Sequence, residues 1–303
     1  MIYTNSKNET NYIDISDFPF GKNGMQFPVV SLFSGAGGLD IGLEESGFHT
    51  AVCVEYDTDC RETLRYNRPE WKLFEEGIKM EKGKMKTRIP GDIRDISVNE
   101  LLKFAGLKKG EATLVVGGAP CQPFSNIGKK LGKHDEKNGD LFLEFVRMVK
   151  GIQPEAFIFE NVVGITQDKH SDVISYMVDK FKGLGYGISH TVLNAANYGV
   201  PQRRERFFLI GIKGVENPAF PFPTHFKDTK HYDSFIKDFE VFPIKKFKKW
   251  VSVKDAFKKI FKNSEKRSDY ALMNVADFDI DRMKLIKQGQ NFKALPMEMR
   301  TNC

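Results

Sequence analysis

Three short segments carry side chains that together suit covalent attack on a flat, polar ring such as a nucleobase. They are Pro120-Cys121-Gln122, Glu160-Asn161-Val162 and Gln202-Arg203-Arg204-Glu205-Arg206. The segments supply a thiol (Cys121), a carboxyl group (Glu160) and two guanidinium groups that can act together (Arg204 and Arg206). An apolar run borders each segment, which predicts that the reactive groups lie beside buried strands.

The reaction that fits these groups is methyl transfer to carbon 5 of cytosine. That carbon is too weak a nucleophile until a thiolate adds at carbon 6, and a proton at ring N3 absorbs the charge of this step. We expect Cys121 to attack, with Arg204 and Arg206 raising its thiolate fraction. Glu160 ends a buried strand, so desolvation would raise its pKa and let it donate the proton. An inert buried thiol and a surface carboxylate are the alternatives.

The glycine turn Phe33-Ser34-Gly35-Ala36-Gly37-Gly38 predicts a site for a nucleotide-like cofactor. It is not the dinucleotide fingerprint, because Asp40 stands where the third glycine would be, and no Walker lysine is present. Glu55, about 20 residues on, has the spacing of a ribose ligand. S-adenosylmethionine therefore fits best, with Phe33 stacking on its adenine and Asp92 accepting from the adenine amino group. The alternative for Asp92 is an ordinary turn residue.

Apolar runs alternate with helical patterns, which predicts an α/β, Rossmann-like fold with a largely parallel, doubly wound sheet. The carboxyl ends of such strands meet at one edge, where ligands bind. The glycine turn, Glu55, Cys121 and Glu160 all fall at predicted strand ends. The expected strands are 27–33, 50–54, 113–118, 156–159 and 207–211, and the expected helices are 39–47, 59–66, 141–149 and one beginning after Ser252. Residues 71–90 read as a surface insertion.

Composition favours a nucleic-acid partner and gives no sign of a membrane or a metal. The 303 residues carry a net charge of +6, and eight lysines crowd residues 245–262. A solvated helix face and phosphate contact are both open interpretations of this run. The glycine-hinged stretch 126–133 could close over a flipped base. No apolar run reaches the roughly 18–20 residues that span a bilayer, and the four cysteines form no metal-binding spacing.

The motifs together resemble the cytosine-C5 DNA methyltransferase family. The matching segments are the glycine turn, Glu55, 91–93, Gly118-Ala119-Pro120-Cys121-Gln122-Pro123-Phe124-Ser125, 160–162 and 202–206, in the family's order. The resemblance implies that Cys121 is the nucleophile, that Glu160 contacts N3 and the amino group, and that Arg206 contacts the carbonyl. It implies a restriction–modification enzyme that flips cytosine out of double-stranded DNA and leaves S-adenosylhomocysteine.

Further residues are assigned to binding on the same basis. The expected cofactor-binding residues are Phe33, Gly35, Ala36, Gly37, Gly38, Glu55, Tyr56, Asp92, Ile93, Pro120 and Leu141. The expected DNA-binding residues are Gln122, Ser125, Lys129, Lys130 and Arg203. Arg203 has the opposite parity to Arg204, so in an extended segment it would face away from the reacting groups.

The predicted organisation is an amino-terminal arm (1–27), a catalytic domain (28–220) and a partial target-recognition region (221–303). The resemblance stops near the carboxyl end, where the family's Arg-rich helix and Gly-Asn-Ser/Ala-Val segment have no counterpart. A second polypeptide that supplies them, or a truncated product, is expected. The chain is placed in the cytoplasm, on the nucleoid when bound to DNA. An RNA cytosine-C5 methyltransferase and a catalytically incomplete DNA-binding subunit are the alternative functions.

Overall fold

The computed structural model describes residues 2–7, 10–14, 27–75, 78–81, 84–87, 89–120, 141–167, 171–239 and 247–261, with 281, 284, 285 and 296 as single positions. The chain divides into two compact units, Met1–Val253 and Lys254–Cys303. The first unit holds the main sheet and the site described below. None of the helices in the described ranges combines the length and apolar character that a bilayer crossing requires.

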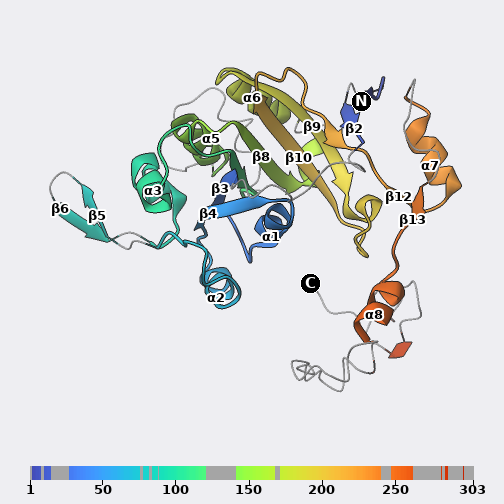
Figure 1. Ribbon diagram of the computed structural model, residues 1–303, viewed down its shortest axis with the longest axis horizontal. Coiled ribbons are helices and arrows are strands. Elements are labelled where there is room, and N and C mark those ends of the chain that lie inside the picture. The colour runs from blue at the N-terminus through green and yellow to red at the C-terminus, as the bar shows by residue number, and fades with distance from the viewer. Residues whose placement is uncertain are drawn as a thin grey trace. The chain divides into compact units, whose positions relative to one another are not determined.

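A six-stranded sheet with the order β4-β3-β7-β8-β10-β9 forms the centre of the first unit (Figure 1). Its strands are β3 (Phe27–Leu32), β4 (Phe48–Val54), β7 (Leu114–Gly117), β8 (Ala156–Val162), β9 (Tyr186–Asn194) and β10 (Glu205–Lys213). Neighbouring strands from β4 to β8 are parallel, and β10 runs antiparallel to both β8 and β9. The largely parallel sheet predicted from the sequence is therefore present, with one reversed strand.

Helices cover both faces of this sheet (Figure 1). The helices of the first unit are α1 (Gly38–Glu45), α2 (Thr58–Asn67), α3 (Val98–Ala105), α5 (Leu141–Ile152), α6 (Ser171–Lys182) and α7 (Thr229–Ile236), with short η1 (Ile93–Asp95), η2 (Val163–Thr166) and η4 (Ala195–Tyr198). The largest core cluster joins α3, α5 and α6 to one face. Leu39 and Leu43 of α1 pack on the other face, against Val116. Because helices pack on both faces, the sheet is doubly wound, as the sequence predicted.

Aromatic rings fill the core beneath α5 and α6. Phe157 of β8 and Phe181 of α6 are fully buried, with ring centroids 4.1 Å apart. Phe145 of α5 meets Phe157 edge-on at 6.1 Å. Gly211 of β10 admits this packing, because a Cβ atom there would lie 2.1 Å from the Phe157 ring. The core thus fixes β8 and β10 side by side, and these strands carry Glu160 and Arg206.

The predicted amino-terminal arm (1–27), in which no strand was expected before residue 27, contains two strands, which corrects that expectation for part of its length. β1 (Ile2–Thr4) pairs with β2 (Asn11–Ile13), and β2 pairs with β11 (Phe220–Pro221). Tyr12 is buried among Phe222, Phe235 and Phe239. Apolar burial of this kind outweighs the polar character of the segment, which was the only signal read from it.

The stretch 71–90 is only partly the surface insertion that was predicted. Trp71 and Phe74 are buried, and Leu73 forms a parallel bridge with Cys53 of β4. Beyond them β5 (Ile78–Glu81) and β6 (Lys84–Thr87) form an antiparallel pair.

The remaining described elements lie after residue 224. They are β12 (His225–Phe226), β13 (Lys248–Lys249) and α8 (Val253–Phe261), and β12 pairs with β13 in parallel. The start of α8 agrees with the helix expected after Ser252. The three-part division of the chain stays a prediction.

Candidate functional site

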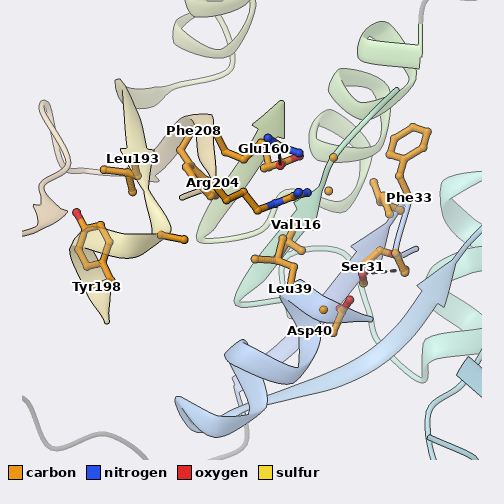
Figure 2. Close-up of a pocket in the computed structure, with 17 residues that line it drawn as sticks. Ser31, Phe33, Leu39, Asp40, Val116, Glu160, Leu193, Tyr198, Arg204 and Phe208 are labelled. Carbon is orange, nitrogen blue, oxygen red and sulfur yellow. Dashed lines mark hydrogen bonds and ion pairs between the residues drawn. The ribbon is translucent and has the colours of Figure 1, made fainter. Parts of the chain in front are cut away.

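A cavity of about 530 Å³ opens on the face of the sheet between α1 and η4. In Figure 2, Leu193 and Tyr198 lie on one side, Phe33, Ser31 and Asp40 on the opposite side, and Glu160, Arg204 and Phe208 between them. The lining residues are Ser31, Leu32, Phe33, Ser34, Gly38, Leu39, Asp40, Val116, Gly117, Gly118, Glu160, Leu193, Ala195, Tyr198, Arg204, Arg206 and Phe208. Its size is that of a small-molecule site.

Strand register brings the acid and the guanidinium groups together. Glu160 lies inside β8, opposite Phe208 of β10, and Arg206 is the next residue of the same parity on β10. Side chains of equal parity share a face, and Arg206 Nε lies 3.0 Å from Glu160 Oε1. Both side chains are about one quarter exposed. Arg204 reaches the same cavity, so the site offers one paired carboxylate with a second cation beside it.

The backbone entering the Cys121 segment is fixed to the strand that carries Glu160. Gly118 lies directly under the carboxylate, because a Cβ atom there would stand 2.7 Å from Glu160 Oε2. The buried Asn161 side chain donates from Nδ2 to the Ala119 carbonyl at 3.1 Å. Two residues before Cys121, the chain is therefore held beside Glu160. The Asn161 bond gives the Glu-Asn pair a structural role that sequence reasoning missed.

The glycine turn follows β3 and carries backbone conformations that side chains rarely adopt. Phe33 has φ +56° and Gly35 has φ +56°. A bulky residue in the left-handed region is strained, and such strain concentrates at ligand sites. Gly37 permits the turn to close, because a Cβ atom there would lie 2.9 Å from both Leu64 and Trp71. The turn holds the Phe33 ring at the cavity.

Glu55 is buried and holds the glycine turn to the end of β4. One carboxylate oxygen accepts from the Gly35 amide at 2.6 Å, and the other accepts from the Asp57 amide at 2.7 Å. Each oxygen retains acceptor capacity, because a carboxylate has about four lone-pair positions. This anchored carboxylate fits the role of binding a ribose diol.

Gly91 allows the chain to bring Asp92, which is expected to accept from the adenine amino group, close to Glu55. With φ +73°, a Cβ atom at this position would lie 1.7 Å from the Glu55 carbonyl oxygen. The following Asp92 is buried and accepts from Arg94 Nε at 2.8 Å and from Arg94 Nη2 at 2.6 Å. These bonds raise the pKa of Arg94. An adenine amino group would therefore share the Asp92 carboxylate with Arg94.

Asp40 is a lining residue that sequence reasoning used only as a departure from a glycine pattern. It is fully buried in the first turn of α1, and neither carboxylate oxygen has a hydrogen-bond partner among the described residues. Burial raises its pKa to about 6, and the nearby Ser31 hydroxyl lowers it only in part. The Ser31 hydroxyl is itself 2.8 Å from the Ser34 hydroxyl. Burial therefore outweighs the effect of the Ser31 hydroxyl at this carboxyl group.

The structure brings some of the predicted residues into the cavity and places others around it. Phe33, Gly38, Glu160, Arg204 and Arg206 line the cavity. Predicted residues that do not line it are Gly35, Ala36, Gly37, Glu55, Tyr56, Asp92, Ile93, Pro120, Leu141 and Arg203. Cys121, Gln122, Ser125, Lys129 and Lys130 lie outside the described residues. Their assigned roles stay predictions.

The segments that carry Glu55, Tyr56 and Asp92 are joined by Arg61. The Arg61 guanidinium donates to the carbonyls of Glu55, Tyr56 and Pro90 and so joins the ends of two segments. The Tyr56 side chain is 54% exposed, which leaves its ring free to cover a ligand. Ile93 is buried in the main core.

Some of the lining residues that were not predicted come from β9 and from η4. Leu193 of β9 pairs with Arg206, and Ala195 and Tyr198 belong to η4. No strand was predicted at β9, although its alternating pattern is a strand signal. Tyr198 donates to the Pro221 carbonyl at 2.8 Å, which fixes this wall.

The family model described as C-5 cytosine-specific DNA methylase matches residues 27–301. The chain is 40% identical over 212 residues to Type II methyltransferase M.AquIA from Picosynechococcus sp., covering 66% of this chain and 78% of that protein. It is 35% identical over 228 residues to Type II methyltransferase M.XorII from Xanthomonas oryzae pv. oryzae, covering 74% of this chain and 50% of that protein.

The chain therefore spans most of M.AquIA but only half of M.XorII. A solved structure of Spodoptera frugiperda DNMT2 aligns with a TM-score of 0.46 at 20% identity, over 64% of this chain and 54% of that chain.

Proposed function

Because the chain belongs to the C-5 cytosine-specific DNA methylase family, we propose that it methylates carbon 5 of cytosine in double-stranded DNA. The observation that carries the proposal is the shared cavity of Glu160, Arg204, Arg206 and Phe33. Acid, cations and an aromatic ring meet at the edge where a parallel sheet binds ligands. Type II methyltransferases among its relatives support a place in a restriction–modification system.

In the proposed mechanism the Cys121 thiolate adds to carbon 6 of a cytosine flipped into the cavity. Glu160 takes part as the neutral acid and gives its proton to ring N3, and Arg206 binds the cytosine carbonyl and holds the Glu160 carboxylate that remains after the transfer. Carbon 5 of the resulting enamine would take the methyl group of S-adenosylmethionine, with S-adenosylhomocysteine as the leaving group. A base then removes the proton from carbon 5, the thiolate leaves as the carbon 5–carbon 6 double bond re-forms, and the proton on N3 returns to Glu160. Asn161 keeps the approach to Cys121 beside Glu160 through its bond to Ala119.

S-adenosylmethionine would supply an electrophilic methyl group on its sulfonium when bound. The residues around the glycine turn fit this cofactor, since Glu55 is buried and held by two backbone amides with acceptor capacity remaining. We assign Phe33 to the adenine ring, Glu55 to the ribose and Asp92 to the adenine amino group. We also propose that the chain works in the cytoplasm on nucleoid DNA, and that a second polypeptide completes target recognition.

A covalent trap tests the proposed function without knowledge of the target sequence. Duplex DNA with 5-fluorocytosine at every cytosine is incubated with the chain and S-adenosylmethionine, and denaturing gels are read for a protein–DNA adduct. Fluorine at carbon 5 blocks the last proton removal, so we expect a stable adduct that Cys121→Ala abolishes. Cys60→Ala is the matched control, because Cys60 lies on α2 outside the cavity. An adduct that persists in Cys121→Ala would refute the assignment.

A parallel reaction with 5-fluorocytosine RNA of the same sequence separates the two substrate classes. An adduct with RNA and none with DNA would replace the DNA proposal by its RNA alternative. Addition of a candidate second polypeptide to the DNA reaction tests the proposed partner, which predicts an increased adduct yield.

A further inference from the structure

A cation outside the cavity lies on an aromatic ring close to the cavity wall. Arg203 is exposed and precedes Arg204, which lines the cavity. The guanidinium carbon of Arg203 lies 5.8 Å from the centre of the Trp250 ring. This separation is within the range of cation–π attraction. A guanidinium group on a ring keeps its N–H donors available for an anion.

Trp250 is fixed in place by two hydrogen bonds. Its indole N–H donates to Asn197 Oδ1 at 3.0 Å, and its backbone amide donates to the Phe226 carbonyl at 3.1 Å. Asn197 belongs to η4, the segment whose Ala195 and Tyr198 line the cavity. The ring under Arg203 is therefore anchored to the wall of the proposed reaction site.

A second cation is held on the same segment. Lys248 is exposed on β13, where it pairs with His225, and its backbone amide donates to the Thr224 carbonyl at 3.0 Å. Burial lowers the pKa of His225, and the charge of Lys248 lowers it further, so Lys248 lies near that ring. His225 in turn packs against Gly199, the residue that ends η4.

The charges of these cations are not neutralised within the described part of the chain. No described carboxylate forms an ion pair with Arg203 or Lys248. The nearest acidic residue along the sequence, Glu205, accepts instead from Asn194 Nδ2 at 3.4 Å. Two exposed cations without counter-charges, on segments that both contact η4, favour an anionic partner, and repeated cations of this kind are what the phosphates of DNA attract.

We propose that Arg203, supported by Trp250, and Lys248 bind the phosphate backbone of duplex DNA beside the cavity. This inference rests on the proposed function, because it places the DNA strand that flanks the flipped base along η4. The contacts would position the duplex and carry no base specificity. We call this set of residues the phosphate ridge.

The slope of DNA affinity against salt tests the phosphate ridge. Binding of a fluorescent duplex is measured by anisotropy from 50 to 300 mM salt for the full chain and its variants. Each phosphate contact contributes a slope of about −0.9 in log K against log salt. We expect Arg203→Gln and Lys248→Gln each to reduce the slope by about that amount. Trp250→Leu removes the ring and should weaken binding through Arg203, with no added loss in the double variant with Arg203→Gln.

Lys180→Gln is the matched control, because Lys180 of α6 also lies over an aromatic ring, Tyr176 at 4.9 Å. α6 packs on the face of the sheet opposite to α1 and the cavity. The slope for Lys180→Gln should therefore equal that of the unmodified chain. Thermal melts of all variants verify that they are folded.

Wild-type slopes in both Arg203→Gln and Lys248→Gln would overturn the ridge, as would failure of the unmodified chain to bind duplex at any salt concentration. The 5-fluorocytosine adduct of the unmodified chain is scored separately. An adduct with unchanged slopes would leave the function standing and remove the ridge. Changed slopes with no adduct, even after addition of the second polypeptide, would support the ridge and remove the methyltransferase proposal.

Discussion

Replacement of Asp40 by Asn is the change whose effect on stability the structure predicts most directly. Asp40 is fully buried at the cavity, and its carboxylate oxygens have no partner among the described residues. Asn has nearly the same shape and stays neutral at every pH. The variant therefore isolates the free-energy cost of ionising this buried group.

The size of that cost follows from the pKa. Burial raises the pKa of Asp40 from 3.8 to about 6 in the folded chain, and this difference corresponds to about 3 kcal/mol. Between these two values the folded state holds more protons than the unfolded state, so wild-type stability falls as the pH rises through the window. Above the window the full penalty applies, and below pH 3.8 it vanishes. Asp40→Asn should thus be more stable by about 3 kcal/mol at pH 7.5, and by little at pH 4.

Urea unfolding at four pH values between 4 and 7.5 measures the predicted difference. Asp59→Asn is the control, because Asp59 also lies in the first turn of a helix but is exposed. Removal of its charge should give a small difference that lacks the dependence on pH. A free-energy difference between Asp40→Asn and wild type that stays constant across this range would refute the reasoning, since a penalty from ionisation must disappear when the group is protonated.

Three further predictions concern the turn, the core and the reacting acid. Gly91→Ala should destabilise the chain by at least about 2 kcal/mol, because its Cβ would overlap the Glu55 carbonyl. Gly110→Ala is the control, because Gly110 has positive φ but open space around it, and it should cost only about 1 kcal/mol. Equal costs of the two variants in thermal unfolding would contradict this account. Phe157→Ala should lower the free energy of unfolding in urea by about 3–5 kcal/mol, because the ring is fully buried against Phe181. A loss below about 1 kcal/mol would show that the core collapses around the gap. Glu160→Gln should slow adduct formation with 5-fluorocytosine DNA by about 10²–10⁴-fold through loss of the proton donor, and an unchanged rate would exclude that role.

Sequence reasoning located the edge of the sheet because chemistry and periodicity agreed there. Apolar runs predicted β3, β7 and β8. Of the polar residues that were expected at strand ends, Glu160 lines the cavity, although β8 continues beyond it to Val162. It missed β9, whose mixed burial gives a weak apolar signal, and with it the wall formed by Leu193 and η4. It also missed β1 and β2, and the pairing of β2 with the distant β11 could not be predicted because contacts between distant segments leave no local pattern.

The hydrogen-bond or ion-pair partner of each carboxyl group could not be predicted from the sequence either, and these partners differ from one carboxyl group to the next. Glu160 is paired with Arg206, Asp92 with Arg94, and Glu55 with two backbone amides. These three groups are compensated before any ligand binds, so they can orient a ligand without a large change in their own solvation. In contrast, neither carboxylate oxygen of Asp40 has a hydrogen-bond partner among the described residues, and the Ser31 hydroxyl offsets its burial only in part. A hydrogen-bond donor that reached Asp40 on ligand binding would relieve the free-energy cost of ionising it. The ligand should therefore stabilise the wild-type chain more than it stabilises the Asp40→Asn variant at pH 7.5, and should stabilise both equally at pH 4.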